Sequence, residues 1–258
     1  MKKKIVFFDI DGTLLDHEKN LPDSTRKAVK TLQQNGVFVA IATGRAPFMF
    51  KYLREELDID SYVSFNGQYV VFENKVIFQN PMNTEKLEDL LGIATKDGYP
   101  LVYLNEETMK ANIEHHPFIE ESMGSLKFIH PEVDEDFYRK KDIFQSLLFC
   151  KAEDEAKYIE EFKEDFHFIR WHPYSTDIIP KGGSKAEGIK QMISKLGFKL
   201  EDVYAFGDGL NDIEMLNAVG TGVAMGNAPD IVKQSADVIT EDVGEDGLYK
   251  GLKSLNLI

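Results

Sequence analysis

The chain of 258 residues contains 43% hydrophobic and 29% charged residues, a balance that is typical of a folded globular protein and excludes a disordered, collagen-like or coiled-coil chain. Its 30 basic and 44 acidic residues give a net charge of −14, which argues against nucleic acid or an anionic membrane surface as a partner. The longest uninterrupted apolar run, residues 37–42, is far shorter than the ~18 residues that a membrane-spanning helix needs.

The first 80 residues alternate short β-rich runs with helical patterns, which is typical of a parallel sheet flanked by helices. We expect Asp23 or Ser24 to cap the first helix and Asn35-Gly36 to end it. The nearly all-apolar run at 4–8 predicts a central strand that is buried on both faces. The predicted elements are strands at 4–8, 37–42 and 62–65, a helix at 23–34, and a hairpin of strands 69–72 and 76–78.

The pattern changes near Pro81, where an α+β insert with mostly antiparallel strands is predicted. Residues 81–184 contain 12 basic and 22 acidic residues, a net charge of −10, whereas the rest of the chain contains 18 and 22, a net charge of −4. This shift in charge supports a separate module. Its predicted elements are helices at 84–97 and 154–165 and strands at 101–104, 109–113, 143–150, 166–171 and 177–179.

From Ser184 the alternation of strand and helix resumes. The pattern predicts helices at 185–196, 211–218 and 248–255, and strands at 203–206, 222–224 and 237–239. Both ends of the chain then contribute to one sheet. The predicted fold class is therefore α/β, with a Rossmann-like parallel-sheet core at 1–80 and 185–258 that is interrupted by an α+β cap domain at 81–184.

Four polar clusters follow predicted strands or begin a helix, at the edge where parallel sheets bind ligands. The clusters are Asp9-Ile10-Asp11-Gly12-Thr13, Thr43-Gly44-Arg45, Ser184-Lys185 and Gly207-Asp208-Gly209-Leu210-Asn211-Asp212. Each cluster alone is equally well explained by an ordinary turn or, for Lys185, by a solvated helix residue. Their joint placement at one edge of one sheet favours a shared site.

Such a site would crowd four carboxylates, those of Asp9, Asp11, Asp208 and Asp212. Like charges this close raise one another's pKa, so a divalent cation with oxygen ligands is expected, and few ligands with retained water favour Mg²⁺. Mg²⁺ often accompanies phosphate, for which the Lys185 ammonium, the Thr43 hydroxyl and the N–H groups of turns are suitable ligands. The residues thus predict a site for Mg²⁺ and a phosphoryl group.

The four clusters, in this order, resemble the four motifs of the haloacid dehalogenase (HAD) superfamily. The runs Phe65-Asn66-Gly67, 222–228 and Glu245-Asp246-Gly247 are similar to those of its Cof-type (subclass IIB) phosphatases. The resemblance covers the core at both ends of the chain. The insert resembles a cap domain of that superfamily mainly in its size, position and predicted elements.

The resemblance implies a role for each motif residue. Asp9 would attack phosphorus and form an aspartyl-phosphate, and Asp11 would protonate the leaving oxygen and later deprotonate water. Mg²⁺ would be held by Asp9, by the backbone carbonyl of Asp11 and by Asp208. Asp212 would orient Lys185 or a water on the metal. The groups that bind the phosphoryl oxygens would come from Ile10, Thr43, Gly44, Lys185 and Asn211.

The resulting prediction is a Mg²⁺-dependent phosphohydrolase that acts on a small phosphorylated metabolite of the sugar-phosphate type, with a cap that closes to exclude water. A phosphomutase on the same scaffold and a non-catalytic phospho-acceptor domain remain as alternatives. Release of inorganic phosphate without a bisphosphate activator would exclude the mutase. Asp11 favours an enzyme, because a passive acceptor has no use for a second carboxylate there.

For several other residues the sequence is compatible with more than one role. Arg45 would form either an ion pair between core and cap or a contact with substrate. Trp171, His172 and Tyr174 could contact substrate, although aromatic residues near the end of the insert more often form its core. The single cysteine, Cys150, lies in an apolar run, and no secretory signal precedes the first strand, so a reducing cytoplasm is expected. The sequence does not indicate an oligomeric state.

Overall fold

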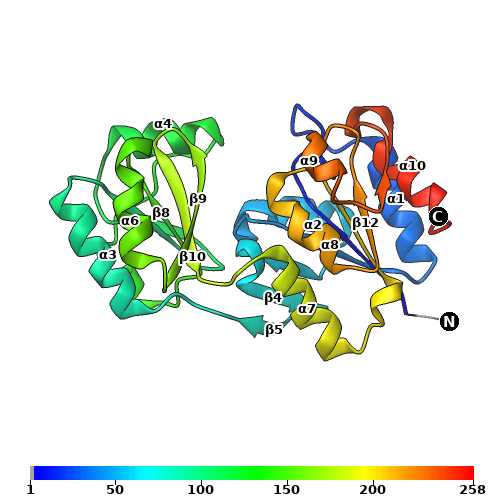
Figure 1. Ribbon diagram of the computed structural model, residues 1–258, viewed down its shortest axis with the longest axis horizontal. Helices are drawn as coiled ribbons and strands as arrows, with labels where there is room; N and C mark the ends of the chain where they lie inside the picture. The colour runs from blue at the N-terminus through cyan, green and yellow to red at the C-terminus, as the bar shows by residue number, and fades with distance from the viewer. Residues whose placement is uncertain (1–2) are drawn as a thin grey trace. The chain divides into compact units, whose positions relative to one another are not determined.

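A computed structural model describes residues 3–258, and Figure 1 shows their two compact units. We call residues 3–45, 49–79 and 184–258 the core unit, and residues 46–48 and 80–183 the insert unit. The predicted core began at residue 1, and residues 1 and 2 lie outside the described part of the chain. None of the helices between residues 3 and 258 has both the length and the apolar composition needed to cross a lipid bilayer.

The core unit is built on an eight-stranded sheet in the order β13-β12-β11-β1-β2-β3-β4-β5. All pairings from β13 to β3 are parallel, whereas β3, β4 and β5 pair antiparallel as a meander. The predicted α/β class with a Rossmann-like parallel sheet is confirmed. The strands are β1 (Ile5–Phe8), β2 (Phe38–Ala42), β3 (Tyr62–Ser64), β4 (Tyr69–Phe72), β5 (Lys75–Gln79), β11 (Val203–Gly207), β12 (Thr221–Ala224) and β13 (Val238–Ile239).

Strand β1 lies between β11 and β2, and all four of its residues are buried, as its apolar sequence predicts. On one face Ile5 and Phe7 belong to a hydrophobic cluster with Ile189 of α7 and Met215 of α8. Helices α1 and α10 lie on the other face (Figure 1). The core helices are α1 (Asp23–Gln34), α2 (Lys51–Leu57), α7 (Lys185–Leu196), α8 (Ile213–Ala218), α9 (Asp230–Lys233) and α10 (Gly247–Ser254).

The start of α1 differs from the predicted cap. The N-cap residue is Pro22, with extended backbone angles and no side-chain hydrogen bond, so Asp23 and Ser24 are already inside the helix. The proline ring fixes φ near −65°, a value that suits the extended backbone of an N-cap. Pro22 can therefore begin the helix although its side chain accepts no hydrogen bond. The end of α1 is as predicted, with Gly36 in the left-handed region at φ +72° after Asn35.

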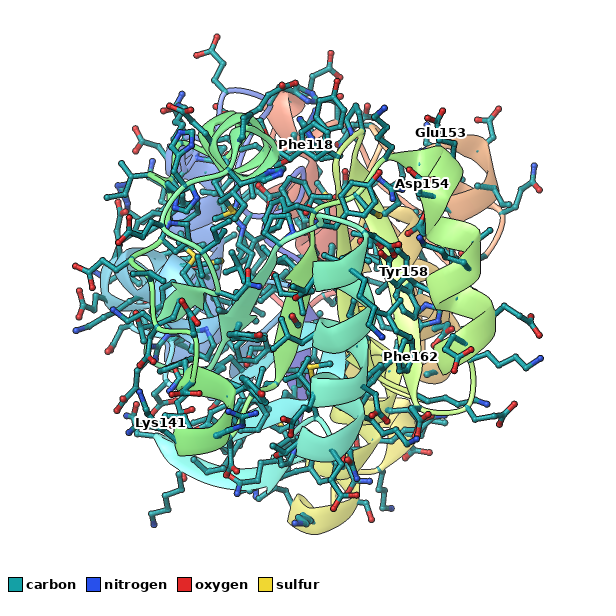
Figure 2. The ribbon with its side chains drawn as sticks, turned by 90° about the vertical axis from the view of Figure 1, so that its left-hand side faces the viewer. Phe118, Lys141, Glu153, Asp154, Tyr158 and Phe162 are labelled. Carbon is teal, nitrogen blue, oxygen red and sulfur yellow. The ribbon has the colours of Figure 1, made fainter. Side chains whose placement is uncertain are left out.

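The insert unit contains a five-stranded antiparallel sheet in the order β7-β6-β8-β10-β9. Its strands are β6 (Leu101–Leu104), β7 (Met109–Ala111), β8 (Gln145–Leu148), β9 (Phe166–His172) and β10 (Ser175–Pro180), and its helices are α3 (Thr84–Lys96), α4 (Pro117–Ser125), α5 (Phe137–Lys140) and α6 (Glu155–Phe162). Tyr158 and Phe162 of α6 join Leu87 of α3 and Tyr103 of β6 in the hydrophobic core of this unit (Figure 2).

Helices α2, α4, α5 and α9 are absent from the predicted elements. Each has nine residues or fewer and buries three residues at most. In α2 the buried positions are Leu53 and Leu57, one pair at i, i+4, which is too little for a helical period to stand out in the sequence.

Candidate active site

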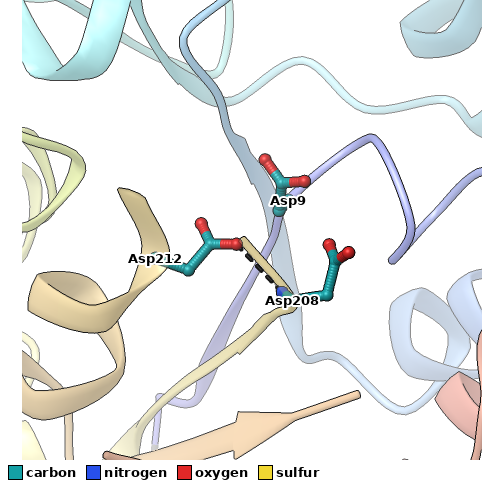
Figure 3. Close-up of side chains that lie close together, drawn as sticks. All are labelled: Asp9, Asp208 and Asp212. Carbon is teal, nitrogen blue, oxygen red and sulfur yellow. Dashed lines mark hydrogen bonds between the residues drawn. The ribbon is translucent and has the colours of Figure 1, made fainter. Parts of the chain in front are cut away.

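The candidate site lies at the carboxyl ends of the central strands of the core unit. Phe8 at the end of β1 is in register with Phe206 of β11, and the N–H of Asp9 donates to the carbonyl of Phe206 at 3.0 Å. Asp9 and Asp208 therefore leave the sheet side by side (Figure 3). Thr43 follows β2, the parallel neighbour of β1, and therefore lies at the same edge of the sheet as Asp9.

Three carboxylates converge at this edge. Asp9, Asp208 and Asp212 each offer an oxygen within 4.8 Å of the others. Asp212 is completely buried, and its Oδ2 accepts hydrogen bonds from the backbone N–H of Asp208 at 2.9 Å and of Gly209 at 2.8 Å (Figure 3). The turn after β11 thus fixes Asp212 in place.

Lys185 is the cation of this group. It is the first residue of α7, directly after the N-cap Ser184, and its side chain is fully buried. Its Nζ donates to Asp9 Oδ1 at 2.5 Å and to Asp212 Oδ1 at 2.6 Å. Burial acts to lower the pKa of Lys185, but the two carboxylates outweigh burial and raise it, so this lysine stays charged.

The three carboxylates carry more negative charge than Lys185 can balance. Burial raises the pKa of Asp9 to about 7, with further increases from Asp212 and Asp208 that oppose the effect of Lys185. Burial and the charge of Asp212 raise the pKa of Asp208 to about 6. A cluster of hard oxygen donors with uncompensated charge fits a divalent cation such as Mg²⁺.

Two side chains orient Asp208. Thr13 Oγ1 donates to its Oδ1 at 3.2 Å, and Asn227 Nδ2 donates to its Oδ2 at 3.1 Å and to the carbonyl of Gly12 at 2.9 Å. Asn227 Oδ1 in turn accepts from the N–H of Val243. Neither Thr13 nor Asn227 is among the site residues that the sequence predicts. Both lie inside runs that resemble family motifs, and that was the only signal available.

Gly12 of the first motif lies against Asp208, and both the space there and its backbone conformation require a glycine. Gly12 has φ +81°, and a Cβ there would lie 2.2 Å from Asp208 Oδ2. Any other residue would displace the carboxylate as well as strain the turn.

The side chain of Asp11 is not part of the group formed by the other three carboxylates, although its charge still contributes to the raised pKa of Asp208. Arg45 donates through Nε to Asp11 Oδ2 at 2.9 Å and through Nη2 to Oδ1 at 2.6 Å, and Lys19 Nζ donates to Oδ1 at 2.6 Å. Burial opposes the charge of Asp11, but the two cations outweigh burial and lower its pKa. Arg45 thus has a partner in its own unit, which is neither of the two roles predicted for it, an ion pair between core and cap or a contact with substrate.

The predicted phosphate-binding residues surround the same edge. Thr43 is buried, and its Oγ1 accepts from the N–H of Arg45 at 3.1 Å. A Cβ on Gly44 would lie 2.9 Å from the side-chain Nδ2 of Asn66, so this amide lies directly against the motif. Asn66 adopts the left-handed region at φ 50°, and its N–H donates to the carbonyl of Thr43.

The remaining predicted ligands are placed differently. Ile10 is buried directly after Asp9, whereas Asn211 is exposed in the turn that precedes α8. Asn211 Oδ1 lies over Gly209, where a Cβ would approach it to 2.7 Å. The site therefore contains an ordered carboxylate and lysine centre with a more exposed amide at its edge.

Comparisons with known proteins agree on one family of hydrolases. A family model described as haloacid dehalogenase-like hydrolase matches residues 6–252. The protein YkrA of Bacillus subtilis (strain 168) is 52% identical over the whole length of both chains. The 5-amino-6-(5-phospho-D-ribitylamino)uracil phosphatase YcsE of the same organism is 30% identical, over 97% of this chain and 94% of its own. The solved structure of the HAD subclass IIB sugar phosphatase BT4131 superimposes with a TM-score of 0.85 and 31% identity, over 99% of this chain and 100% of its own.

Proposed function

The chain belongs to the haloacid dehalogenase-like hydrolase family and is a phosphatase, and we propose that it hydrolyses small phosphate monoesters of the sugar-phosphate type. The observation that carries this proposal is the Asp9 carboxylate, placed at the end of β1 between a buried lysine and a second carboxylate. The names of YcsE and BT4131 support phosphorylated metabolites and sugars as the substrate class.

In the proposed first step, Asp9 attacks phosphorus. Lys185 holds its Oδ1, so Oδ2 is the oxygen that forms the new P–O bond as the P–O bond to the leaving group breaks. Lys185 also keeps the carboxylate in one orientation, and Asp212, itself fixed by two backbone N–H groups, keeps Lys185 in place.

Asp11 is proposed as the group that moves protons. It gives a proton to the leaving oxygen and then takes one from the water that hydrolyses the aspartyl-phosphate. Arg45 and Lys19 hold it as a carboxylate, the form that the second step needs. For the first step Asp11 must carry a proton, so its ion pair with Arg45 has to open before the leaving group departs.

The donor set described above fits Mg²⁺, with Asp9, Asp208 and the backbone carbonyl of Asp11 proposed as its ligands. When bound, the cation would offset the repulsion between the carboxylate nucleophile and the anionic substrate. Thr43, the N–H groups of Ile10 and Gly44, Lys185 and the Asn211 amide are proposed to bind the phosphoryl oxygens.

The insert is proposed to act as the cap domain, with the domain division at 1–80 plus 185–258 and 81–184. We further propose that the protein resides in the cytoplasm, because the single cysteine of the chain, Cys150, is a buried free thiol.

The proposed function is tested by phosphate release. Purified protein is incubated with a panel of phosphorylated metabolites, with Mg²⁺ and with excess EDTA. We expect release from several sugar phosphates that depends on Mg²⁺ and needs no bisphosphate activator. No release from any compound of the panel would contradict the proposal and favour a phospho-acceptor.

The Asp208→Asn variant is expected to need a higher Mg²⁺ concentration for half-maximal activity, by about tenfold or more, with little change in fold. The amide keeps the shape of the side chain but lacks the negative charge that attracts the cation. Titration of activity with Mg²⁺ measures the effect. Asp246→Asn is the matched control, because Asp246 is exposed and has the left-handed backbone that asparagine tolerates. An unchanged Mg²⁺ requirement would exclude Asp208 as a ligand.

The affinity for Mg²⁺ is expected to rise with pH between about 5 and 8. Burial raises the pKa of Asp9 to about 7 and of Asp208 to about 6, so near pH 5 both carboxyls hold protons that a cation must displace. Each displaced proton changes the apparent affinity by up to about tenfold per pH unit.

The same raised pKa values stabilise the metal-free fold at low pH, and this contribution is lost as the pH rises toward about 7. Mg²⁺ should therefore add more to the free energy of unfolding at neutral pH than at about pH 5. Calorimetric titration at several pH values, together with denaturant unfolding, measures both effects. An affinity that is independent of pH would show that these carboxyls do not bind the cation.

A further inference from the structure

The turn Phe65-Asn66-Gly67 follows β3, and no step of the proposed reaction uses it. Its three residues have φ values of 51°, 50° and 97°, all in the left-handed region. Phenylalanine rarely adopts this region, so the run costs conformational free energy that the surrounding structure must offset. Backbone of this kind is concentrated at functional sites, so the contacts of the turn bear on function.

Hydrogen bonds fasten the turn to the loop that follows β2. The N–H of Asn66 donates to the carbonyl of Thr43 at 3.1 Å, and the N–H of Phe65 donates to the carbonyl of Arg45 at 3.3 Å. Because Thr43 is proposed to bind a phosphoryl oxygen, the backbone of Asn66 is fixed beside one of the proposed phosphate ligands.

The turn also packs against the start of α7. A Cβ on Gly67 would lie 2.1 Å from the carbonyl oxygen of Ser184 and 3.1 Å from the backbone nitrogen of Gly188, so only a glycine fits there. Ser184 is the N-cap of the helix whose first residue is Lys185. The turn therefore contacts both of the segments that carry Thr43 and Lys185, two proposed ligands of the phosphoryl group.

The side chain of Asn66 lies over Gly44, and only 5% of Asn66 is exposed. A Cβ on Gly44 would lie 2.9 Å from Nδ2 and 3.1 Å from Oδ1 of Asn66, so the amide group lies across this glycine. Within residues 3–258 neither atom of the amide has a hydrogen-bond partner. A buried amide without a partner costs free energy, and a bound molecule that supplies the partner removes this cost.

The left-handed backbone does not by itself explain an asparagine at position 66. Glycine meets the same backbone conformation at no steric cost. Asparagine side chains in turns commonly bond to a neighbouring backbone group and thereby stabilise the turn, whereas the amide of Asn66 makes no such bond. The amide is therefore free to bind a ligand.

We propose that Asn66 is a further ligand of the phosphoryl group, with its Nδ2 donating a hydrogen bond to a phosphoryl oxygen beside the N–H of Gly44. This inference rests on the proposed function. Phosphoryl oxygens only accept hydrogen bonds, and a donor that burial holds in place stabilises them without having to reorient. Asn66, Gly44 and Thr43 all belong to the core unit, so the proposed contact lies within one unit.

The test measures binding of inorganic phosphate, which has phosphoryl oxygens but no organic part. Calorimetry in the presence of Mg²⁺ compares the unmodified chain with Asn66→Gly, which allows the left-handed backbone and removes the amide. We expect the dissociation constant for phosphate to rise about tenfold or more, the effect of one hydrogen bond to a charged group. The affinity for Mg²⁺ without phosphate should be unchanged.

Asn66→Asp is the second variant, because aspartate has the shape of asparagine and also tolerates the left-handed backbone. It replaces the donor with an anion, so phosphate should bind more weakly than to Asn66→Gly. Asn74 provides the matched control, since it is an exposed asparagine with φ 60° between β4 and β5. Asn74→Gly and Asn74→Asp should bind phosphate as the unmodified chain does.

Kinetics give a second readout. Asn66→Gly should lower kcat/KM for glucose 6-phosphate and for p-nitrophenyl phosphate by the same factor, because both esters share the phosphoryl group. A loss confined to one of them would place the amide against the organic part and overturn the inference.

The inference is also overturned if phosphate does not bind to the unmodified chain, or if it binds to Asn66→Gly with unchanged affinity. Equal losses in Asn66→Gly and Asn66→Asp would show that the side chain does not face the anion. A matching loss of Mg²⁺ affinity would indicate a structural role instead. Failure of the proposed function is separate, because it shows as absence of phosphate release by the unmodified chain, whereas phosphate binding is measured without turnover.

Discussion

The Asp9→Asn variant is expected to lose phosphate release by at least about 10⁴-fold and to form no phosphoenzyme. The amide keeps the shape of the carboxylate and can still accept a hydrogen bond from Lys185, but it cannot attack phosphorus. It also removes one charge from a buried group that holds more negative charge than its lysine balances, so the metal-free fold should not be weakened. Phosphate release and intact-protein mass after rapid quench measure the two effects.

Asp58→Asn is the matched control for this variant. Asp58 is exposed and has φ 52° at the end of α2, where asparagine is equally tolerated, so its activity should equal that of the unmodified chain. A covalent phosphate adduct on the Asp9→Asn protein would show that another residue is the nucleophile.

The placement of the site could be predicted because it depends on features that the sequence shows directly. The apolar run of β1 predicts a central strand, and the bounds of α7 follow from its period, its capping serine and Gly197 at its end. Parallel strands bring their carboxyl ends to one edge, so Asp9 and Asp208 had to meet once both strands were recognised.

The direction of the Asp11 side chain could not be predicted in the same way. It depends on Lys19, in a loop with left-handed backbone at φ 66°, and on Arg45 in the loop that follows β2. Neither the loop conformation nor the choice between these ion pairs leaves a periodic pattern in the sequence. The same is true of Asn227, which reaches Asp208 from a segment that follows β12.

The partners of Asp9 and Asp11 differ in burial, and this difference has a consequence for the proposed reaction. The proposed nucleophile is fixed by a fully buried lysine, whereas the proposed proton carrier is held by two partly exposed cations. An ion pair that is partly open to solvent is weaker than a fully buried one, so releasing Asp11 from Arg45 costs less free energy than releasing Asp9 from Lys185 would. Rigid positioning of Asp9 and a mobile Asp11 suit a residue that must act first as an acid and then as a base.

The Asp11→Asn variant is expected to release phosphate about 10²–10⁴-fold more slowly, because it keeps the nucleophile but lacks the proton carrier. Both formation and hydrolysis of the aspartyl-phosphate should slow with ordinary substrates. With p-nitrophenyl phosphate the leaving group needs no proton, so formation should be partly restored while hydrolysis stays slow. A covalent phosphate should then accumulate on Asp9 of this variant.

Rapid quench followed by peptide mass spectrometry locates the adduct and measures its lifetime. The Asp9→Asn/Asp11→Asn double variant is the control and should carry no phosphate, because the accumulating species needs the Asp9 carboxylate. Asp11→Asn removes ion pairs that are partly exposed, so its fold should be as stable as that of the unmodified chain to within about 1 kcal/mol. Full turnover by Asp11→Asn, or an adduct on the double variant, would contradict the two roles, since either result needs a proton carrier or a nucleophile other than these aspartates.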